Sequence, residues 1–197
     1  MVRPADCHKA GRPLRQRRSV EALHHHIVDA ESSDQMMTEV SESGSPGSSQ
    51  PPHIACDAVL KIARGHVDTI ICHARADHPD EACGVIIGAA GSDQPTRLVQ
   101  MINAERSPTF FRFDPQEQLR LYNEMDANDE EIVVVYHSHT MTEAYPSRTD
   151  IELAAEPQAH YLLVSTAGSG NQDGPVELRS YRILGGVVTE EEIEITE

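Results

Sequence analysis

Three residues of this chain have the types and spacing of metal ligands. His137 and His139 flank one serine, and Asp150 follows eleven residues after His139. Alternate residues of an extended segment point to the same side, so both imidazoles can face one ion. The intervening residues, 140–146, form a loop long enough to return the carboxylate to that ion. Two histidines and one carboxylate leave a fourth position open, which is typical of a catalytic rather than a structural zinc site. We therefore expect one zinc ion per chain.

Hydrolysis at such a site also needs a base and a group that stabilises the oxyanion. A carboxylate is suited to moving the proton of the attacking water, and Glu81, just before an apolar segment, is the candidate. Ser147 can donate a hydrogen bond to the oxyanion. Each residue also has a structural interpretation, because Ser147-x-x-Asp150 is typical of a helix capping box and a single glutamate is usually a surface residue. The combined spacing H-x-H-x7-S-x2-D favours the metal site over coincidence.

Alternating and apolar patterns predict the elements that position these side chains. Helices are expected at 66–76, 115–127 and 147–156, and the strand at 131–136, apolar on both faces, leads directly into His137. The other expected strands are 59–62, 82–87, 97–102, 109–113, 161–165, 177–184 and 187–195. This order predicts a single α/β domain built on a central mixed sheet.

The first 53 residues read as an N-terminal extension of low complexity, ahead of a domain at 54–197. Their end, 41–52, is rich in Gly, Ser and Pro, which is typical of a flexible linker. The extension contains His24, His25 and His26. Adjacent helical residues point in different directions, so this run does not predict one metal site.

Charge and composition exclude several classes of function. The net charge is −16, which disfavours a nucleic-acid groove and an anionic membrane surface. No apolar run is long enough to span a bilayer, and the N-terminus lacks the apolar segment of a secretion signal. The four cysteines are too sparse for a disulfide scaffold. These features favour a cytoplasmic protein.

A distal glutamate followed by H-[ST]-H-x7-S-x2-D resembles the JAMM motif of the MPN+ metalloproteases. Every position of that motif is matched here, by Glu81, His137, Ser138, His139, Ser147 and Asp150. The stretch E-A-C-G-V-I-I-G that begins at Glu81 resembles the family's E-x-C-G-x-x-x-G. The resemblance covers about residues 57–197. It implies zinc-dependent hydrolysis of a peptide or isopeptide bond on a cytidine-deaminase-like α/β/α sandwich.

A narrower resemblance is to the Mec proteins of actinobacteria. It rests on H-P-D-E-A-C-G-V, N-A-E-R-S-P-T-F, Y-H-S-H-T-M-T-E-A-Y-P-S-R-T-D and L-R-S-Y-R-I. Mec proteins remove a cysteine from the C-terminus of CysO, a ubiquitin-like sulfur carrier, during cysteine biosynthesis. The resemblance implies that the carrier's extended tail is the substrate, and such a tail can add as a strand to an exposed sheet edge.

Three residues on or near the loop after His139 are candidates for substrate contact: Thr142, Tyr145 and Arg148. Tyr145 has an equally good interpretation as a packing residue, and Arg148 as the partner of a carboxylate on the same helix face. Cys83 would close the open zinc position if it were a ligand, so we interpret it as a small buried apolar residue.

Three other functions compete with this prediction. The first is a peptidase for another ubiquitin-like carrier, such as one for thiamine or molybdopterin, or for a small peptide. The second is a non-catalytic MPN scaffold, which the complete ligand set disfavours. The third is a deaminase-like or nuclease-like enzyme, which the acidic charge and the lack of a C-x-x-C zinc pair disfavour.

Overall fold

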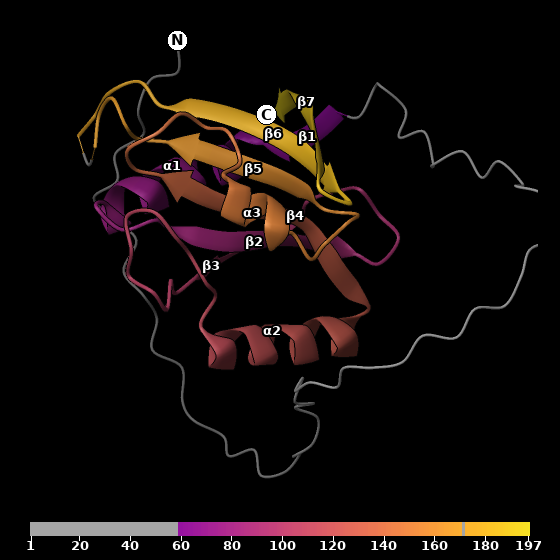
Figure 1. Cartoon of the computed structure of the whole chain (residues 1–197). Coiled ribbons are helices and arrows are strands. Elements are labelled where there is room, and N and C mark those ends of the chain that lie inside the picture. Colours follow the sequence, from indigo (N-terminus) through magenta and orange to yellow (C-terminus); the bar gives the residue numbers. More distant parts are fainter. Residues whose placement is uncertain (1–58, 171) are drawn as a thin grey trace, which may run out of the picture. The chain divides into compact units, whose positions relative to one another are not determined.

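A seven-stranded mixed sheet organises the residues that this computed structural model describes, 59–170 and 172–197 (Figure 1). The strand order is β1-β7-β6-β5-β4-β2-β3, and the pairs β1/β7 and β4/β5 are parallel while the others are antiparallel. The strands are β1 (Val59–Ala63), β2 (Cys83–Ala89), β3 (Arg97–Met101), β4 (Glu130–His139), β5 (His160–Ser165), β6 (Glu177–Leu184) and β7 (Val187–Thr196), and the helices are α1 (Arg64–Asp77), α2 (Pro115–Asn128) and α3 (Arg148–Glu152).

Helices cover both faces of this sheet. Helix α1 buries Val67, Ile70 and Ala74 on one face, in a core shared with buried side chains of β2, β4 and β5. Helix α2 buries Leu121 and Met125 on the other face, where the partly buried Ile151 of α3 also packs. Two separate apolar cores result, one on each side of the sheet. The predicted α/β sandwich with a mixed sheet is confirmed.

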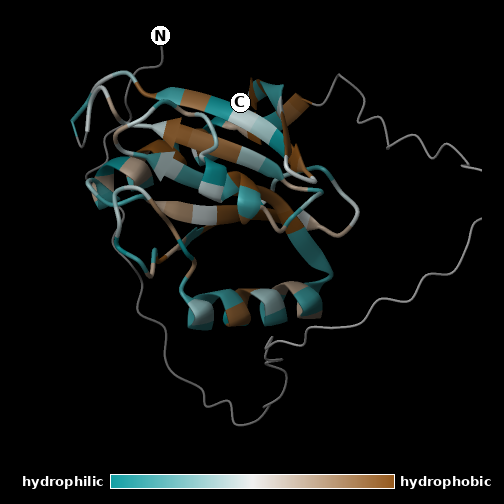
Figure 2. Ribbon diagram, viewed as in Figure 1, coloured by the Kyte–Doolittle hydropathy of each residue, from teal (hydrophilic) through white to brown (hydrophobic). Residues whose placement is uncertain are grey.

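Strand β4 lies inside the sheet, between β5 and β2, and is buried from Ile132 to His139. The run of valines is accommodated by a bulge, because Ile86 pairs with Val134 whereas Ile87 pairs with Ile132. Val133 is therefore an extra residue on β4. The bulge leaves Ile132 and Val135 on the face that α2 covers. Figure 2 shows the resulting apolar centre of the sheet in brown.

The predicted strand at 109–113 is wrong. Phe113 makes an isolated antiparallel bridge to Asn103 but belongs to no strand. Phe111 and Phe113 instead pack against the apolar core under α2, with their ring centroids 5.6 Å apart. The alternation of aromatic residues thus reflects side-chain packing without strand pairing.

The predicted helix at 147–156 is too long, since α3 ends at Glu152. The hydroxyl of Tyr161 accepts a hydrogen bond from the Glu156 N–H at 3.0 Å and donates to the Glu156 carbonyl at 3.2 Å. These bonds hold the segment after α3 in a non-helical course. The predicted N-terminal extension, with its histidine run, lies outside the described residues.

Two remaining predictions concern cysteines and membranes. Cys83 is free and buried, as interpreted from the sequence, whereas Cys72 takes part in a disulfide bond, which was not expected. In the part of the chain that the structure describes, no helix has the length and apolar character needed to cross a membrane.

Candidate metal centre

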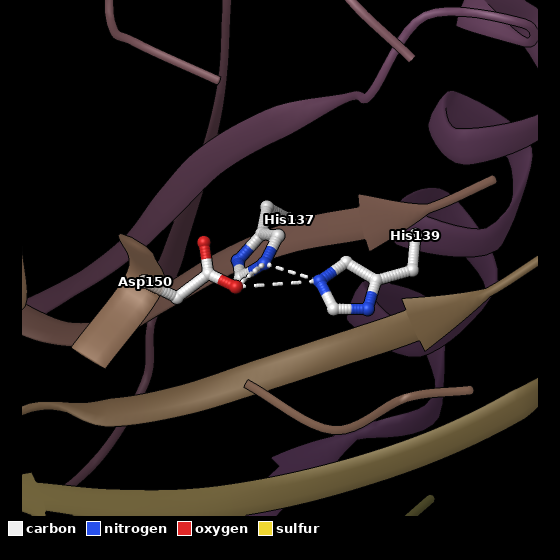
Figure 3. Close-up of side chains that lie close together, drawn as sticks. All are labelled: His137, His139 and Asp150. Atoms are coloured by element: carbon white, nitrogen blue, oxygen red, sulfur yellow. Dashed lines mark hydrogen bonds and ion pairs between the residues drawn. The ribbon is translucent and has the colours of Figure 1, made fainter. Parts of the chain in front are cut away.

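The two histidines of the motif lie side by side at the end of β4. Their side chains project from the face that α2 covers, where the ring of His137 stacks on Phe111 with centroids 4.5 Å apart. Both residues are buried, with 2% and 4% of their surface exposed. Their Nε2 atoms are 3.1 Å apart (Figure 3). Strand periodicity alone accounts for this arrangement.

Asp150 reaches the histidines from the first turn of α3. Its Oδ2 atom lies 3.5 Å from Nε2 of His137 and 3.4 Å from Nε2 of His139. A capping box orients the carboxylate, since Oδ2 accepts the Ser147 N–H at 2.7 Å while Ser147 Oγ accepts the Asp150 N–H at 3.2 Å. The helix-capping and metal-site interpretations of this motif are therefore compatible, because the cap directs the candidate ligand Asp150 toward both histidines.

The three converging atoms have the spacing of zinc ligands. With bonds of about 2.0–2.1 Å, two ligands of a tetrahedral zinc ion lie about 3.3 Å apart. The measured separations are 3.1, 3.4 and 3.5 Å. Among the described residues, His137, His139 and Asp150 are the one group of three or more such side chains close enough to hold a metal ion. The donor set therefore fits zinc and leaves one tetrahedral position open.

Hydrogen bonding orients His139 for this role. Its Nδ1 atom is 2.8 Å from the carbonyl oxygen of Glu143 and 3.2 Å from Oγ1 of Thr142. A carbonyl oxygen only accepts hydrogen bonds, so Nδ1 carries a proton and donates it. Nε2 is then the nitrogen available to a metal, as is usual when a ligand histidine bonds to a backbone carbonyl.

The charges at the centre favour a bound cation. Burial alone would raise the pKa of the Asp150 carboxyl, but the neighbouring imidazoles of His137 and His139 hold that pKa well below its ordinary value. Burial lowers the pKa of His137. At His139 burial acts in the same direction, but the interactions with Asp150, the Glu143 carbonyl and Glu81 together outweigh it and raise the pKa. The carboxylate is thus ionised beside two imidazoles, and within the described residues its ion-pair partners are these histidines.

Glu81 lies two residues before the start of β2, beside the end of β4. Its N–H donates to the Ser107 carbonyl at 2.9 Å, and its own carbonyl accepts from Nδ2 of Asn103 at 3.0 Å. The next residue, Ala82, accepts the Ser138 N–H at its carbonyl and donates its own N–H to the Ser138 hydroxyl, both at 2.9 Å. The serine between the two histidines therefore fixes the segment that carries Glu81.

The carboxyl of Glu81 is held partly protonated near neutral pH. Only 5% of the residue is exposed. Burial raises its pKa from 4.5 to about 7, with His139 opposing the shift and Asp150 adding to it. These interactions place the carboxyl in the electrostatic field of the metal centre. A carboxyl with a pKa near the working pH is suited to both accepting and returning a proton.

The other predicted site residues differ in what they contact. The Ser147 hydroxyl accepts the capping bond and keeps its proton for donation. Thr142 touches His139, as described above. Tyr145 is 47% exposed and packs edge-on against Tyr181. Arg148 pairs with Glu152 at 2.7 Å and its side chain is 90% exposed. These contacts match the structural alternatives for Tyr145 and Arg148, and substrate contact by any of the three stays a prediction.

Asn103 was missed by residue-based reasoning. Its side-chain nitrogen donates to the carbonyls of Glu81 and Phe110, and its oxygen accepts from the N–H groups of Glu105 and Arg112. All its hydrogen-bonding groups thus tie the loop at 103–113 to the backbone of Glu81. The residue lies in the N-A-E-R-S-P-T-F stretch. That stretch contributes to the resemblance to the Mec proteins, but the sequence alone indicates no role for Asn103.

A cavity of about 190 Å³ adjoins the metal centre, with His137 and Asp150 in its wall. The wall is otherwise mainly apolar and aromatic, and includes Phe110, Phe111, Phe113, Tyr122, Ile132, Val135, Leu153 and Tyr161. The candidate ligands His137 and Asp150 therefore border a space that can take an apolar group.

A family model described as prokaryotic homologs of the JAB domain matches residues 63–184. The chain is a JAB-domain protein. The match spans every strand from β2 to β6 and all residues of the metal centre. The resemblance to JAMM/MPN+ proteins inferred from the motif is confirmed.

This JAB domain is also similar to proteins of named activity and to a solved structure. It is 57% identical over 139 residues to the CysO-cysteine peptidase of Mycobacterium tuberculosis, covering 71% of this chain and 92% of that protein. It is 32% identical over 114 residues to the desampylase of Haloferax volcanii, covering 55% and 82%. The solution structure of a Desulfitobacterium hafniense protein superimposes with a TM-score of 0.60 at 32% identity, covering 71% and 94%. The narrower resemblance to the CysO-cysteine peptidases is confirmed as well.

Proposed function

We propose that this JAB-domain protein is a zinc-dependent peptidase that removes a C-terminal cysteine from a ubiquitin-like sulfur carrier of the CysO type. The observation that carries the proposal is the tetrahedral spacing of His137 Nε2, His139 Nε2 and Asp150 Oδ2, beside a buried glutamate whose pKa is about 7. The 57% identity to a CysO-cysteine peptidase supports the choice of substrate.

His137, His139 and Asp150 would hold the zinc ion, one per chain. The bound ion would polarise the scissile carbonyl and lower the pKa of a water molecule at the open position. Glu81 takes the proton of the attacking water and returns it to the departing cysteine nitrogen. Burial serves this role, because the raised pKa makes the protonated glutamic acid accessible at neutral pH.

Ser147 is the proposed donor to the oxyanion. Its hydroxyl lies one helical turn before Asp150 and accepts the capping bond through a lone pair. The hydroxyl proton can therefore point elsewhere, toward an oxygen that gains charge during the reaction. Because capping and donation use different parts of the hydroxyl, the two functions are compatible.

A second candidate substrate belongs to the same class. The similarity to a desampylase at 32% identity favours conjugates of another ubiquitin-like carrier. The same centre would cleave both, so the difference lies in which tail the apolar cavity and its surroundings accept. For the CysO-type reaction we also propose a cytoplasmic location.

The test is mass spectrometry of two carriers incubated with the enzyme: one ending in an added cysteine and one joined to a lysine side chain. Loss of one cysteine residue, blocked by a chelator and restored by zinc, is the expected result. Cleavage of the lysine conjugate alone would favour the second candidate. A chain that binds zinc stoichiometrically but cleaves neither would overturn the proposed function.

A further inference from the structure

The metal loop, residues 140–146 between His139 and Ser147, is held by side chains of the neighbouring strands β5 and β6. Ala144 lies at the centre of this contact, where both of its backbone groups are bonded. Its N–H donates to Oε2 of Glu177 at 2.9 Å, and its carbonyl accepts from the Tyr181 hydroxyl at 2.7 Å. We propose that Tyr181 and Glu177 are positioning residues for the metal centre.

The two residues occupy positions that suit this role. Glu177 and Tyr181 are four residues apart in β6, so they project from the same face of the sheet. Tyr181 has no exposed surface, and Tyr145 of the loop packs on its ring. Arg179, between them on the same face, pairs with the other carboxylate oxygen of Glu177 at 2.6 Å. Glu177 is thereby held with Oε2 directed at the loop.

A third bond extends the contact to β5. Ser165 donates its hydroxyl proton to the carbonyl of Thr142 at 2.5 Å. The loop is thus bonded on both sides of Glu143, at Thr142 and at Ala144. The carbonyl of Glu143 is the acceptor for Nδ1–H of His139, so these bonds determine where that acceptor lies.

The consequence for the metal follows from the direction of His139. Hydrogen bonds to the outer nitrogen of a ligand histidine set the ring orientation and the tautomer, and their loss typically lowers metal affinity 10- to 100-fold. Tyr181 and Glu177 touch no ligand. They act indirectly: their hydrogen bonds to Ala144 hold the loop in place, and the neighbouring Glu143 carbonyl of that loop orients His139. The inference rests on the proposed zinc site but needs no particular substrate.

The experiment compares zinc affinities of the full chain and its variants by competition with a chromophoric chelator. Tyr181→Phe and Glu177→Ala are expected to weaken zinc binding about tenfold. Glu177→Gln retains an acceptor oxygen for the Ala144 N–H and should restore most of the affinity. The matched control is Tyr136→Phe, which also deletes a buried hydroxyl, bonded to His73 at 2.9 Å on the opposite face of the sheet.

A second measurement separates positioning from general loss of structure. In the zinc-loaded protein, the NMR signal of the His139 Nδ1–H should exchange with water faster in Tyr181→Phe and Glu177→Ala than in Tyr136→Phe. Equal zinc affinity and equal exchange in all variants would overturn the proposal. If Tyr181→Phe does not fold, the half-exposed Glu177 provides the test by itself. Failure of the parent chain to cleave a carrier would leave this result intact, since zinc binding is measured directly.

Discussion

Two clusters that pair buried histidine with carboxylate lie on opposite faces of the sheet, and only one of the two has the geometry of a metal site. The first is the metal centre on the α2 face. The second surrounds His160 at the start of β5, on the α1 face, where Nδ1 lies 2.6 Å from Glu191 and Nε2 lies 2.8 Å from Asp93. Both clusters combine buried imidazole with carboxylate. Residue composition therefore does not distinguish them.

The difference lies in the charge that each cluster already contains. Arg182 lies 2.9 Å from Nε2 of His160, 3.2 Å from Glu191 and 3.5 Å from Asp93. The Ser180 hydroxyl also donates to Glu191 at 2.6 Å. A permanent cation and a donor thus compensate the carboxylates around His160. At the metal centre, three acceptor atoms converge on one point instead. Of the two clusters, the candidate metal site is the one whose acceptor atoms converge and whose carboxylate has no lysine or arginine partner among the described residues.

The largest expected effect separates the clusters directly. His139→Ala removes one of three ligands and should weaken zinc binding by at least about 1,000-fold, whereas His160→Ala should keep stoichiometric zinc. Chelator competition on both purified variants measures the difference. Tight zinc binding by His139→Ala would mean that the ligand set is wrong.

The next effect separates proton transfer by Glu81 from zinc binding by the three ligands. Glu81→Gln keeps the shape of the side chain but cannot accept a proton, so turnover should fall about 100-fold or more. Zinc content should not change. Steady-state cleavage of the carrier conjugate and elemental analysis provide the two readings. Near-normal turnover would remove Glu81 from the role of base.

Disruption of the second cluster should affect stability instead. Arg182→Met leaves Glu191 buried without its cation, which is expected to cost about 3 kcal/mol of unfolding free energy. Zinc affinity should stay within about twofold, because effects at sites that share no partner are close to independent. Urea unfolding of the metal-free chain and chelator competition give both values. A parallel loss of zinc affinity would contradict the separation of the two clusters.

The smallest effect concerns pH and the metal-free chain. The pKa of Glu81 is raised in the fold from 4.5 to about 7, so the fold binds this proton more tightly than the unfolded chain does. Buried Glu81 therefore lowers the free energy of unfolding least below pH 4.5, where it is protonated in both states. This destabilisation grows as the pH rises from 4.5 through about 7. Glu81→Gln should be more stable than the parent at pH 8, and this advantage should disappear toward pH 4.5. Melting temperatures across that range test the sign, and a variant less stable at pH 8 would contradict it.

Much of the metal centre could be predicted from the sequence because its determinants are local. The alternation of strand residues places His137 and His139 together, and the capping box that orients Asp150 spans four residues. Helices α1 and α2 were likewise predicted to within two residues at each end, from apolar spacing and from Pro115 at the first helical position.

Tertiary structure decided what depends on distant segments. Glu81 joins the centre because β2 pairs with β4, through a contact between Ala82 and Ser138 that are 56 residues apart. Tyr181 holds the metal loop from 37 residues away. The segment at 109–113 has a strand pattern, yet it packs its aromatic side chains without a partner strand. Periodicity records which way a side chain points, whereas the partner that it meets depends on which strands pair and which charges are buried beside it.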